Sequence, residues 1–284
     1  MKQKTLKLLA AAAAVAILAG LGWFANVFIG NPVSRALAAR TAETHLAEVY
    51  PGRDFYIDGL NYSFKDTGYH AHIKSPSSED SSFTLFLSMT GRLVYDDYDY
   101  RVTERNNTAE RLSMASRALA DTVLESPSFP YESHIAFGNL EFWSDQEADI
   151  VQEYPYAIRT STLELDKVYN IAALGAEAGR LVLYLYHDPA DIDAEHMAAV
   201  LLDVKSRFDD AGAPFYAVDL VLQPFQTEEG APAQNVRMEV LSFLYRDIYE
   251  DGLVDRVRAA DQAARAYRAE QDAKRKDLQA AEST

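Results

Sequence analysis

Cysteine is absent from this sequence of 284 residues. Its absence excludes disulfide bonds, thiolate zinc sites, cysteine nucleophiles and a lipid-modified N-terminal cysteine. Basic residues are also scarce: 27 Lys and Arg stand against 43 Asp and Glu, and the net charge is −16. Nucleic-acid phosphates demand clustered Lys and Arg. The charge balance therefore argues against nucleic acid as a partner.

Recognisable catalytic and cofactor motifs are also missing. The sequence contains no phosphate-binding loop, HExxH, CxxC or dinucleotide-binding fingerprint. The serine-rich stretch SPSSEDSS, residues 75–82, lacks the glycine elbow that exposes a hydrolase nucleophile. We interpret this stretch as a polar hairpin loop between two strands. We therefore assign no catalytic, cofactor-binding or metal-ligating residue, and the sequence argues against an enzyme more than for one.

The composition is nevertheless that of a folded protein. Apolar residues make up 48% of the chain and aromatic residues 11%, which is enough for hydrophobic cores. A chain of 284 residues also exceeds one average domain. We therefore expect two folded units with additional segments attached to them.

The N-terminal region has the character of a membrane anchor. Three lysines precede an uncharged stretch, residues 8–29, that is long enough for a membrane-spanning helix. A cleaved signal peptide is the alternative, because residues 36–38 read ALA, but Pro32 and Arg35 intervene. We favour an uncleaved single-pass anchor, with tail and anchor together occupying residues 1–30. The basic flank then stays in the cytoplasm, and the rest of the chain lies outside the cell.

Residues 31–126 predict a first extracytoplasmic domain of the α+β class. Apolar residues recur at helical spacing over the first twenty positions. Residues 54–98 then alternate as four strands of an antiparallel meander, and a bulge at Gly59 keeps their apolar side chains on one face. The first helix covers that face, a layout analogous to PepSY-type or cystatin-like modules. A second long helix, residues 104–126, ends the domain.

Residues 127–248 predict a second α+β domain. Residues 180–186 form a nearly continuous apolar run, which is typical of a central strand covered on both faces. Asp166 is the predicted N-cap of the helix before this strand. The acid-rich residues 188–195 suit the N-terminus of the helix after it. Two later apolar runs are predicted to pair as a hairpin, and residues 249–284 predict a C-terminal helix with a thin apolar stripe and a solvated charged face.

Three stretches of the chain carry a family resemblance: GNPVSRALAARTAETHLAEVYPGRDF (residues 30–55), YSFKDTGYHAHIKSPSSEDSSFTLFLSMTGRLVYDDY (residues 62–98) and FPYESHIAFGNLEF (residues 129–142). They resemble the YfjL-like family of Gram-positive bacterial proteins. The resemblance is strongest from residue 30 to residue 142 and weaker over the second domain. It implies a small membrane-anchored protein with one N-terminal helix. Because the function of this family is uncharacterised, the resemblance implies no functional residues.

The motif His70-x-His72 is the sharpest candidate for a site. Alternation along a strand places both imidazoles on one face, where their nitrogens can bind a metal. Zinc sites commonly use three or more protein ligands, and the nearest candidates are Glu79 and Asp80. The simpler interpretation is a strand whose other residues face the core, which leaves both histidines outside without a metal. We expect structural or solvated roles for the remaining histidines, His45, His134, His187 and His196.

A second candidate is the acidic group Asp96, Asp97 and Asp99, whose carboxylates can bind calcium. No glycine turn or terminal bidentate glutamate accompanies them at the spacing of a calcium-binding loop. We interpret these residues as the end of a strand that leads into the next helix. The three tyrosines interleaved with the acids offer an exposed contact surface instead.

Together these observations predict a single-pass membrane protein with two tandem α+β domains outside the cell. The function they favour is a non-catalytic binding or regulatory module of the cell envelope, with a membrane protein or a peptide as partner. An envelope hydrolase without a recognisable motif and a structural envelope protein are the alternatives. A deep pocket with convergent polar groups favours the enzyme. A shallow apolar or tyrosine-rich patch, or an open sheet edge, favours binding.

Overall fold

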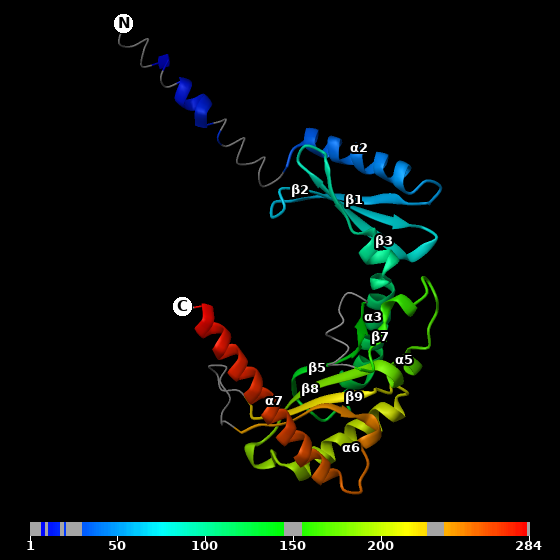
Figure 1. The fold of residues 1–284 in the computed structure, drawn as a ribbon, viewed down its shortest axis with the longest axis vertical. Coiled ribbons are helices and arrows are strands. Elements are labelled where there is room, and N and C mark those ends of the chain that lie inside the picture. The colour runs from blue at the N-terminus through cyan, green and yellow to red at the C-terminus, as the bar shows by residue number, and fades with distance from the viewer. Residues whose placement is uncertain are drawn as a thin grey trace. The chain divides into compact units, whose positions relative to one another are not determined.

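The computed structural model describes residues 7–8, 11–17, 20, 30–144, 155–225 and 236–282 (Figure 1). The chain forms two compact units, Met1–Thr108 with Leu163–Lys167 and Ala109–Thr162 with Val168–Thr284. The division lies within helix α3 (Asn106–Leu124), whereas the sequence placed a boundary after residue 126. Ala120 and Val123 on this helix belong to the hydrophobic core of the second unit, which explains where the division falls.

The first unit is a helix packed on a four-stranded sheet. Its elements are α2 (Pro32–Val49), β1 (Tyr56–Ser63), β2 (Gly68–Ser75), β3 (Ser78–Ser88), β4 (Leu93–Asp96) and the π-helix η1 (Asp99–Thr103). The strands lie in the order β1-β2-β3-β4, and every adjacent pair is antiparallel. The predicted helix and meander are therefore confirmed. The predicted bulge is confirmed as well, because the β1–β2 register shifts between Ile57 and Gly59.

Alternating strand residues build the core of the first unit. The inward-facing side chains of β2 and β3 are at most 3% exposed: Tyr69, Ala71, Ile73, Phe83, Leu85 and Leu87. Helix α2 meets them with Ala38 and Ala42, whose small side chains let the helix approach the sheet closely. Burial of this apolar area, at about 25 cal/mol per Å², is the main force that holds the helix on the sheet.

The second unit is a mixed sheet packed against helices. Its elements, with α3, are β5 (Ser133–Leu140), β6 (Phe142–Trp143), β7 (Ile158–Arg159), η2 (Thr160–Thr162), α5 (Ile171–Ala178), β8 (Gly179–Tyr186), η3 (Pro189–Asp191), α6 (Ala194–Asp210), β9 (Ala217–Gln223), β10 (Met238–Leu244), η4 (Tyr245–Asp247) and α7 (Leu253–Glu282). The main sheet has the order β10-β9-β8-β5, in which only β8 and β9 run parallel. The predicted β9–β10 hairpin is confirmed, and the predicted polar loop between these strands, residues 226–234, lies outside the described residues. Both units are therefore α+β.

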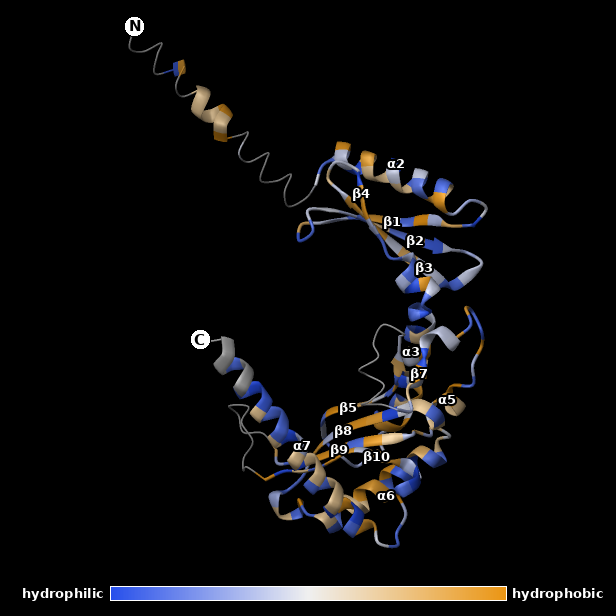
Figure 2. Cartoon of the chain, in the orientation of Figure 1, coloured by the Kyte–Doolittle hydropathy of each residue, from blue (hydrophilic) through white to orange (hydrophobic). Residues whose placement is uncertain are grey.

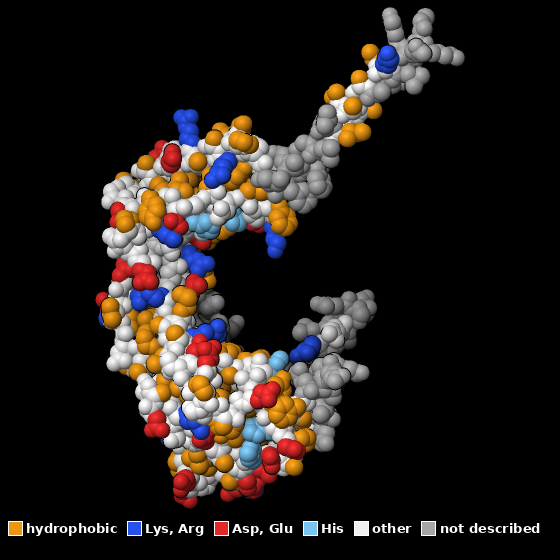
Figure 3. Space-filling view, turned by 180° about the vertical axis from the view of Figure 1, so that it is seen from behind, with side chains coloured by type: hydrophobic (Ala, Val, Ile, Leu, Met, Phe, Trp, Pro, Cys, Tyr) orange, Lys and Arg blue, Asp and Glu red, His pale blue; other side chains and the backbone are white. Residues whose placement is uncertain are grey.

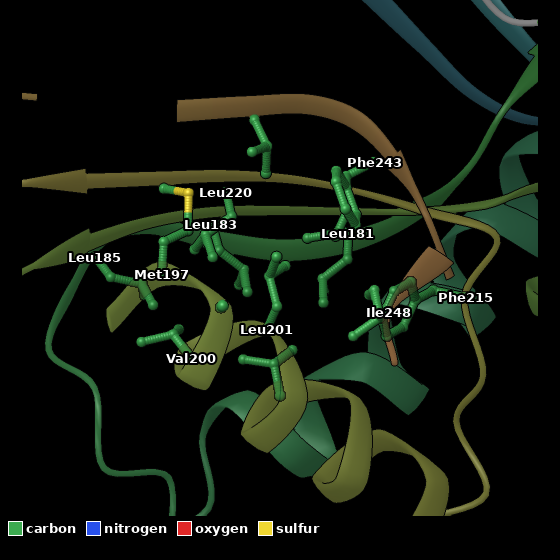
Figure 4. Close-up of a cluster of buried hydrophobic side chains, with 14 of the residues drawn as sticks. Leu181, Leu183, Leu185, Met197, Val200, Leu201, Phe215, Leu220, Phe243 and Ile248 are labelled. Atoms are coloured by element: carbon green, nitrogen blue, oxygen red, sulfur yellow. The ribbon is translucent and has the colours of Figure 1, made fainter. Parts of the chain in front are cut away.

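The core of the second unit lies between the sheet and α6. Figure 4 shows Leu181, Leu183 and Leu220 of the sheet pointing towards Met197 and Leu201 of the helix. These five side chains are at most 1% exposed. Helix α3 contributes buried residues to the same cluster, so α3 and α6 cover the same face of the sheet.

Two details of the predicted second domain were wrong. Strand β8 is central, but its residues alternate between buried and half-buried, and its buried leucines belong to the hydrophobic core on one face of the sheet. Asp166 does not cap α5; the N-cap is Asn170, whose Oδ1 accepts a hydrogen bond from Ala173 N at 3.1 Å. Asp166 instead has a left-handed φ of +58°, and its carboxylate accepts a hydrogen bond from the backbone N–H of Asp80 in the first unit's sheet.

Helix α7 begins inside the core and continues into solvent. Leu253, Val257 and Ala264 are at most 4% exposed, which confirms the predicted apolar stripe. Beyond Ala264 the described side chains are almost all exposed, and Figure 2 shows the hydrophilic character of this part. Pairs of opposite charge one turn apart, such as Glu270 and Lys274 with 2.7 Å between Oε1 and Nζ, lie along this exposed part of the helix.

The predicted membrane segment, residues 8–29, lies mostly outside the described residues. Among the residues that are described, no helix combines the length and the apolar character needed to cross a membrane. Residues 11–17 are helical, and the side chains of Val15 and Ile17 are 66% and 62% exposed.

Candidate functional site

Strand β2 places His70 and His72 on the face opposite the core, as the alternation of apolar residues predicted. Figure 3 shows histidine side chains at the surface of each unit. His70 is half-buried: its Nε2 lies 2.9 Å from Asp66 Oδ2, and its ring packs against Phe86. His72 is exposed, and its Nδ1 lies 3.4 Å from the hydroxyl of Thr84. The two rings therefore have separate partners rather than a shared one.

Asp80, one of the two acids nearest in sequence to these histidines, is turned into the protein. Its side chain is buried, and its Oδ2 accepts hydrogen bonds from Thr108 Oγ1 and from the backbone N–H of Asp166, each at 2.8 Å. Glu79 is exposed. In the part of the chain that the structure describes, no three His, Asp or Glu side chains are grouped to hold a metal ion.

The three acids of the candidate calcium site diverge. Asp96 Oδ2 is 2.7 Å from both His45 Nε2 and the hydroxyl of Tyr50. Asp97 is buried, whereas Asp99 accepts a hydrogen bond inside η1. Burial, and then the hydrogen bond to Asp96, raise the pKa of Tyr50 far above its usual range. This cluster ties the end of α2 to the end of β4, which is a structural role.

Two other histidines contact each other in the second unit. His196 Nε2 lies 3.0 Å from His187 Nδ1, and the rings meet edge-on with 4.7 Å between centroids. Burial, and then the neighbouring His196, lower the pKa of His187. The Nε2 atom of His187 is buried without a hydrogen-bond partner among the described residues. The contact joins the end of β8 to the first turn of α6 and favours the neutral form of His187.

A large, mostly apolar pocket of the second unit lies between strand β10 and helix α7. Its volume is about 560 Å³, within the range of ligand-binding pockets. We call it the α7 pocket, and it is lined by Arg180, Asp219, Leu241, Ser242, Phe243, Leu244, Asp247, Ala260, Ala263, Ala264 and Tyr267. Most of this lining is apolar, and the charged groups come from the sheet and from η4.

Arg180 and Asp219 form the floor of the α7 pocket at the sheet. Arg180 Nε donates to Asp219 Oδ2 at 3.1 Å, its Nη2 pairs with the same oxygen, and its Nη1 lies 3.4 Å from Glu141 Oε1. Asp219 is 5% exposed, so its charge requires this partner. Two carboxylates therefore compensate the one guanidinium of the lining.

A bulge in β10 shapes the wall of the pocket. The β9–β10 register shifts between Val240 and Phe243, and Ser242 within the bulge has a left-handed φ of +49°. The backbone N–H of Ser242 donates to Asp219 Oδ1 at 2.6 Å, which holds this unusual conformation. Bulges of this kind redirect side chains beside binding and catalytic sites.

Asp247 is the lining carboxylate without an ion pair. It is half-buried, and its side chain has no hydrogen-bond or ion-pair partner among the described residues. The nearby Arg256 donates to the backbone carbonyl of Asp247 at 3.0 Å, not to its carboxylate. Among the carboxylates that line the α7 pocket, Asp247 is therefore the one that forms no ion pair with a described residue.

Further buried charges position α7 over the sheet. Asp261 accepts hydrogen bonds from the backbone N–H of Glu239 at 3.0 Å and from Arg265 Nε at 2.7 Å. Glu239 in turn pairs with Arg237 at 3.1 Å and with Arg268. Because removal of one member leaves a buried charge unpaired, this network fixes the helix against β10 and keeps the pocket wall in place.

The α7 pocket has few polar side chains in its lining. Covalent catalysis needs a nucleophile within hydrogen-bond reach of a base, and its two hydroxyl residues, Ser242 and Tyr267, share the lining with no histidine. Asp219, the buried carboxylate, is engaged by Arg180 and by the backbone of Ser242. What remains is an apolar surface with one available carboxylate.

Sequence reasoning missed the α7 pocket because its parts are far apart in the chain. Arg180 and Asp219 stand 39 residues apart and meet through the parallel pairing of β8 and β9. The one local signal is that Arg180 begins an otherwise apolar strand. The sequence around Asp247 contains no signal that this residue lines a pocket.

The comparisons with known proteins assign a family. The YfjL-like N-terminal domain matches residues 5–113, and the YfjL-like C-terminal domain matches residues 116–258. The chain therefore belongs to the YfjL-like family, as the sequence resemblance predicted. No curated protein matches the chain in a sequence comparison. The structure of a DUF5037 family protein from Ruminococcus gnavus is similar at 13% identity and a TM-score of 0.24, covering 79% of this chain and 98% of that one.

Proposed function

We propose that this YfjL-like protein is a non-catalytic binding module of the cell envelope, held at the outer surface of the cell membrane by its N-terminal segment. The observation that carries the binding role is the α7 pocket, whose apolar walls and single available carboxylate offer contacts but no reacting pair. Its guanidinium and buried carboxylate already satisfy each other. An apolar pocket with a few placed polar groups is the usual form of a binding site.

The membrane location rests on the N-terminal sequence. Residues 8–29 are uncharged and long enough to span the hydrocarbon core, and Lys2, Lys4 and Lys7 precede them. Positive flanks stay on the cytoplasmic side, which directs both compact units outside. Anchoring raises the effective concentration of the module near a membrane-protein partner.

Protease treatment of intact, wall-stripped cells tests this location. We expect both units to be digested and the short N-terminal tail to be protected. Replacement of residues 8–29 by an unrelated membrane helix of the same orientation serves as the control, and it is expected to preserve function. A soluble mature protein that begins near residue 39 contradicts the anchor.

A second experiment tests the absence of catalysis. The purified full-length chain in detergent is incubated with peptide, ester and glycan substrates, and we expect no turnover. Turnover that is lost on substitution of a single Asp, Glu or His makes the protein an envelope hydrolase instead.

A further inference from the structure

The charge and shape of the α7 pocket indicate what kind of partner fits it. Arg180 is compensated by Asp219 and Glu141, so it has little attraction left for an anion. Asp247 is half-buried with no ion pair among the described residues. A half-buried carboxylate beside apolar walls gains most from a cation, because their interaction is screened less than at an open surface.

The apolar part of the lining comes from both β10 and α7. Phe243 and Leu244 line the β10 side, and Ala260 and Ala263 line the α7 side over a full helical turn. Alanines leave the helix surface low, so a second backbone can approach closely. A volume of about 560 Å³ exceeds that of one side chain and matches several consecutive ones.

We infer that the α7 pocket binds a basic, amphipathic peptide segment of a partner protein. A lysine or arginine side chain of that segment pairs with the carboxylate of Asp247, and its apolar side chains pack against Phe243 and the alanines of α7. The net charge of the chain, −16, attracts such a segment before contact. This inference rests on the proposed binding function and names the partner chemistry of the same pocket.

The experiment uses the full-length chain in detergent and a fluorescein-labelled helical peptide of leucine and lysine with its leucines on one face. Two comparison peptides keep its length, one with every lysine replaced by glutamate and one with every leucine replaced by serine. Fluorescence anisotropy measures the Kd of each. We expect binding of the leucine–lysine peptide alone, and a Kd that increases with salt concentration.

Two substitutions with matched controls locate the binding. Asp247→Asn removes the charge and keeps the shape, and we expect it to weaken binding about tenfold or more, as for loss of one charge-assisted contact. Its control is Asp251→Asn, which removes an equal charge at an exposed position outside the lining. Ala263→Trp fills the pocket and is expected to abolish binding, whereas Ala266→Trp, exposed on the same helix but outside the lining, is expected to preserve it.

Circular dichroism melts of all four variants show whether each remains folded; Ala263 is exposed, so its replacement leaves the core intact. Peptide binding that is unchanged in both Asp247→Asn and Ala263→Trp overturns the inference. Equal binding of phenethylamine and the peptide at this pocket also overturns it, in favour of a small-amine site. Failure of the peptide to bind, while crosslinking on cells still yields a partner that is lost with Ala263→Trp, refutes the peptide class and leaves the proposed function standing.

Discussion

The hydroxyl oxygen of Tyr69 lies 2.8 Å from the hydroxyl oxygen of Ser34, deep between the sheet and the start of α2. The same Tyr69 hydroxyl donates to the carbonyl of Asn31 at 3.0 Å and lies 3.1 Å from its backbone nitrogen. Gly30 packs so closely that a Cβ there would lie 2.5 Å from the Tyr69 hydroxyl. The first residues after the apolar N-terminal stretch are therefore fixed to the fold.

Removal of this hydroxyl tests the connection. Tyr69→Phe removes one hydrogen-bond partner from Asn31 and one from Ser34, whose own contact remains, and we expect the first unit to lose about 1 kcal/mol of unfolding free energy. Urea unfolding of the full-length chain in detergent measures the loss. The control is Tyr56→Phe, whose ring is 45% exposed and whose substitution is expected to change little. Equal stability of the two variants contradicts this prediction.

The buried carboxylate of Asp80 is expected to hold the segment Leu163–Lys167 in the first unit. Asp80→Ala removes the acceptor of Thr108 Oγ1 and of Asp166 N, at a cost of about 2 kcal/mol or more. We also expect faster tryptic cleavage after Lys167, because the segment loses its attachment. Limited proteolysis followed by mass spectrometry measures the rate. Glu79→Ala, at an exposed neighbouring position, is the matched control and should cleave at the original rate.

The His187–His196 contact predicts a dependence of stability on pH. The pKa of His187 is lowered in the folded state, so the unfolded chain binds the proton more readily. Its stabilising effect is therefore present above the unfolded pKa of about 6.5 and is lost as the pH falls through the folded pKa. One proton changes stability by at most about 1.4 kcal/mol per pH unit.

Urea midpoints at pH 7.5 and pH 5 measure this dependence. We expect His187→Gln to reduce the difference between the two midpoints, because glutamine does not titrate. His134→Gln removes an exposed histidine and is expected to leave the difference unchanged. A pH dependence that is identical in both variants refutes the role of His187.

The two histidines of β2 are predicted to contribute little to stability. Replacement of both His70 and His72 by glutamine is expected to change unfolding free energy by about 1 kcal/mol or less, as for surface positions. Metal analysis of the purified protein accompanies the unfolding curves. Stoichiometric zinc, together with a large loss of melting temperature on chelation, contradicts the prediction.

Local pattern was sufficient for most elements of the first unit. The alternation of Tyr69, Ala71 and Ile73 predicted which face of β2 is buried, because side chains along a strand point alternately to opposite faces. Gly59 marked the bulge, because the apolar residues of β1 occupy odd positions before it and even positions after it. Helix α2 and the turn after β3 follow from equally short-range signals. Local sequence patterns were therefore enough to predict these elements, their buried faces and the α+β class.

The contacts between polar residues that are far apart in the chain could not be predicted from these patterns. Asp166 looked like a helix cap by its distance from α5, but its backbone turns left-handed and bonds to Asp80, 86 residues away. His45 reaches Asp96 across 51 residues, and Arg180 reaches Asp219 through a parallel crossover. Periodicity reports the orientation of a side chain relative to its own element. The partner of a buried charge depends instead on how the helices and strands pack against one another. A short stretch of sequence does not contain this information.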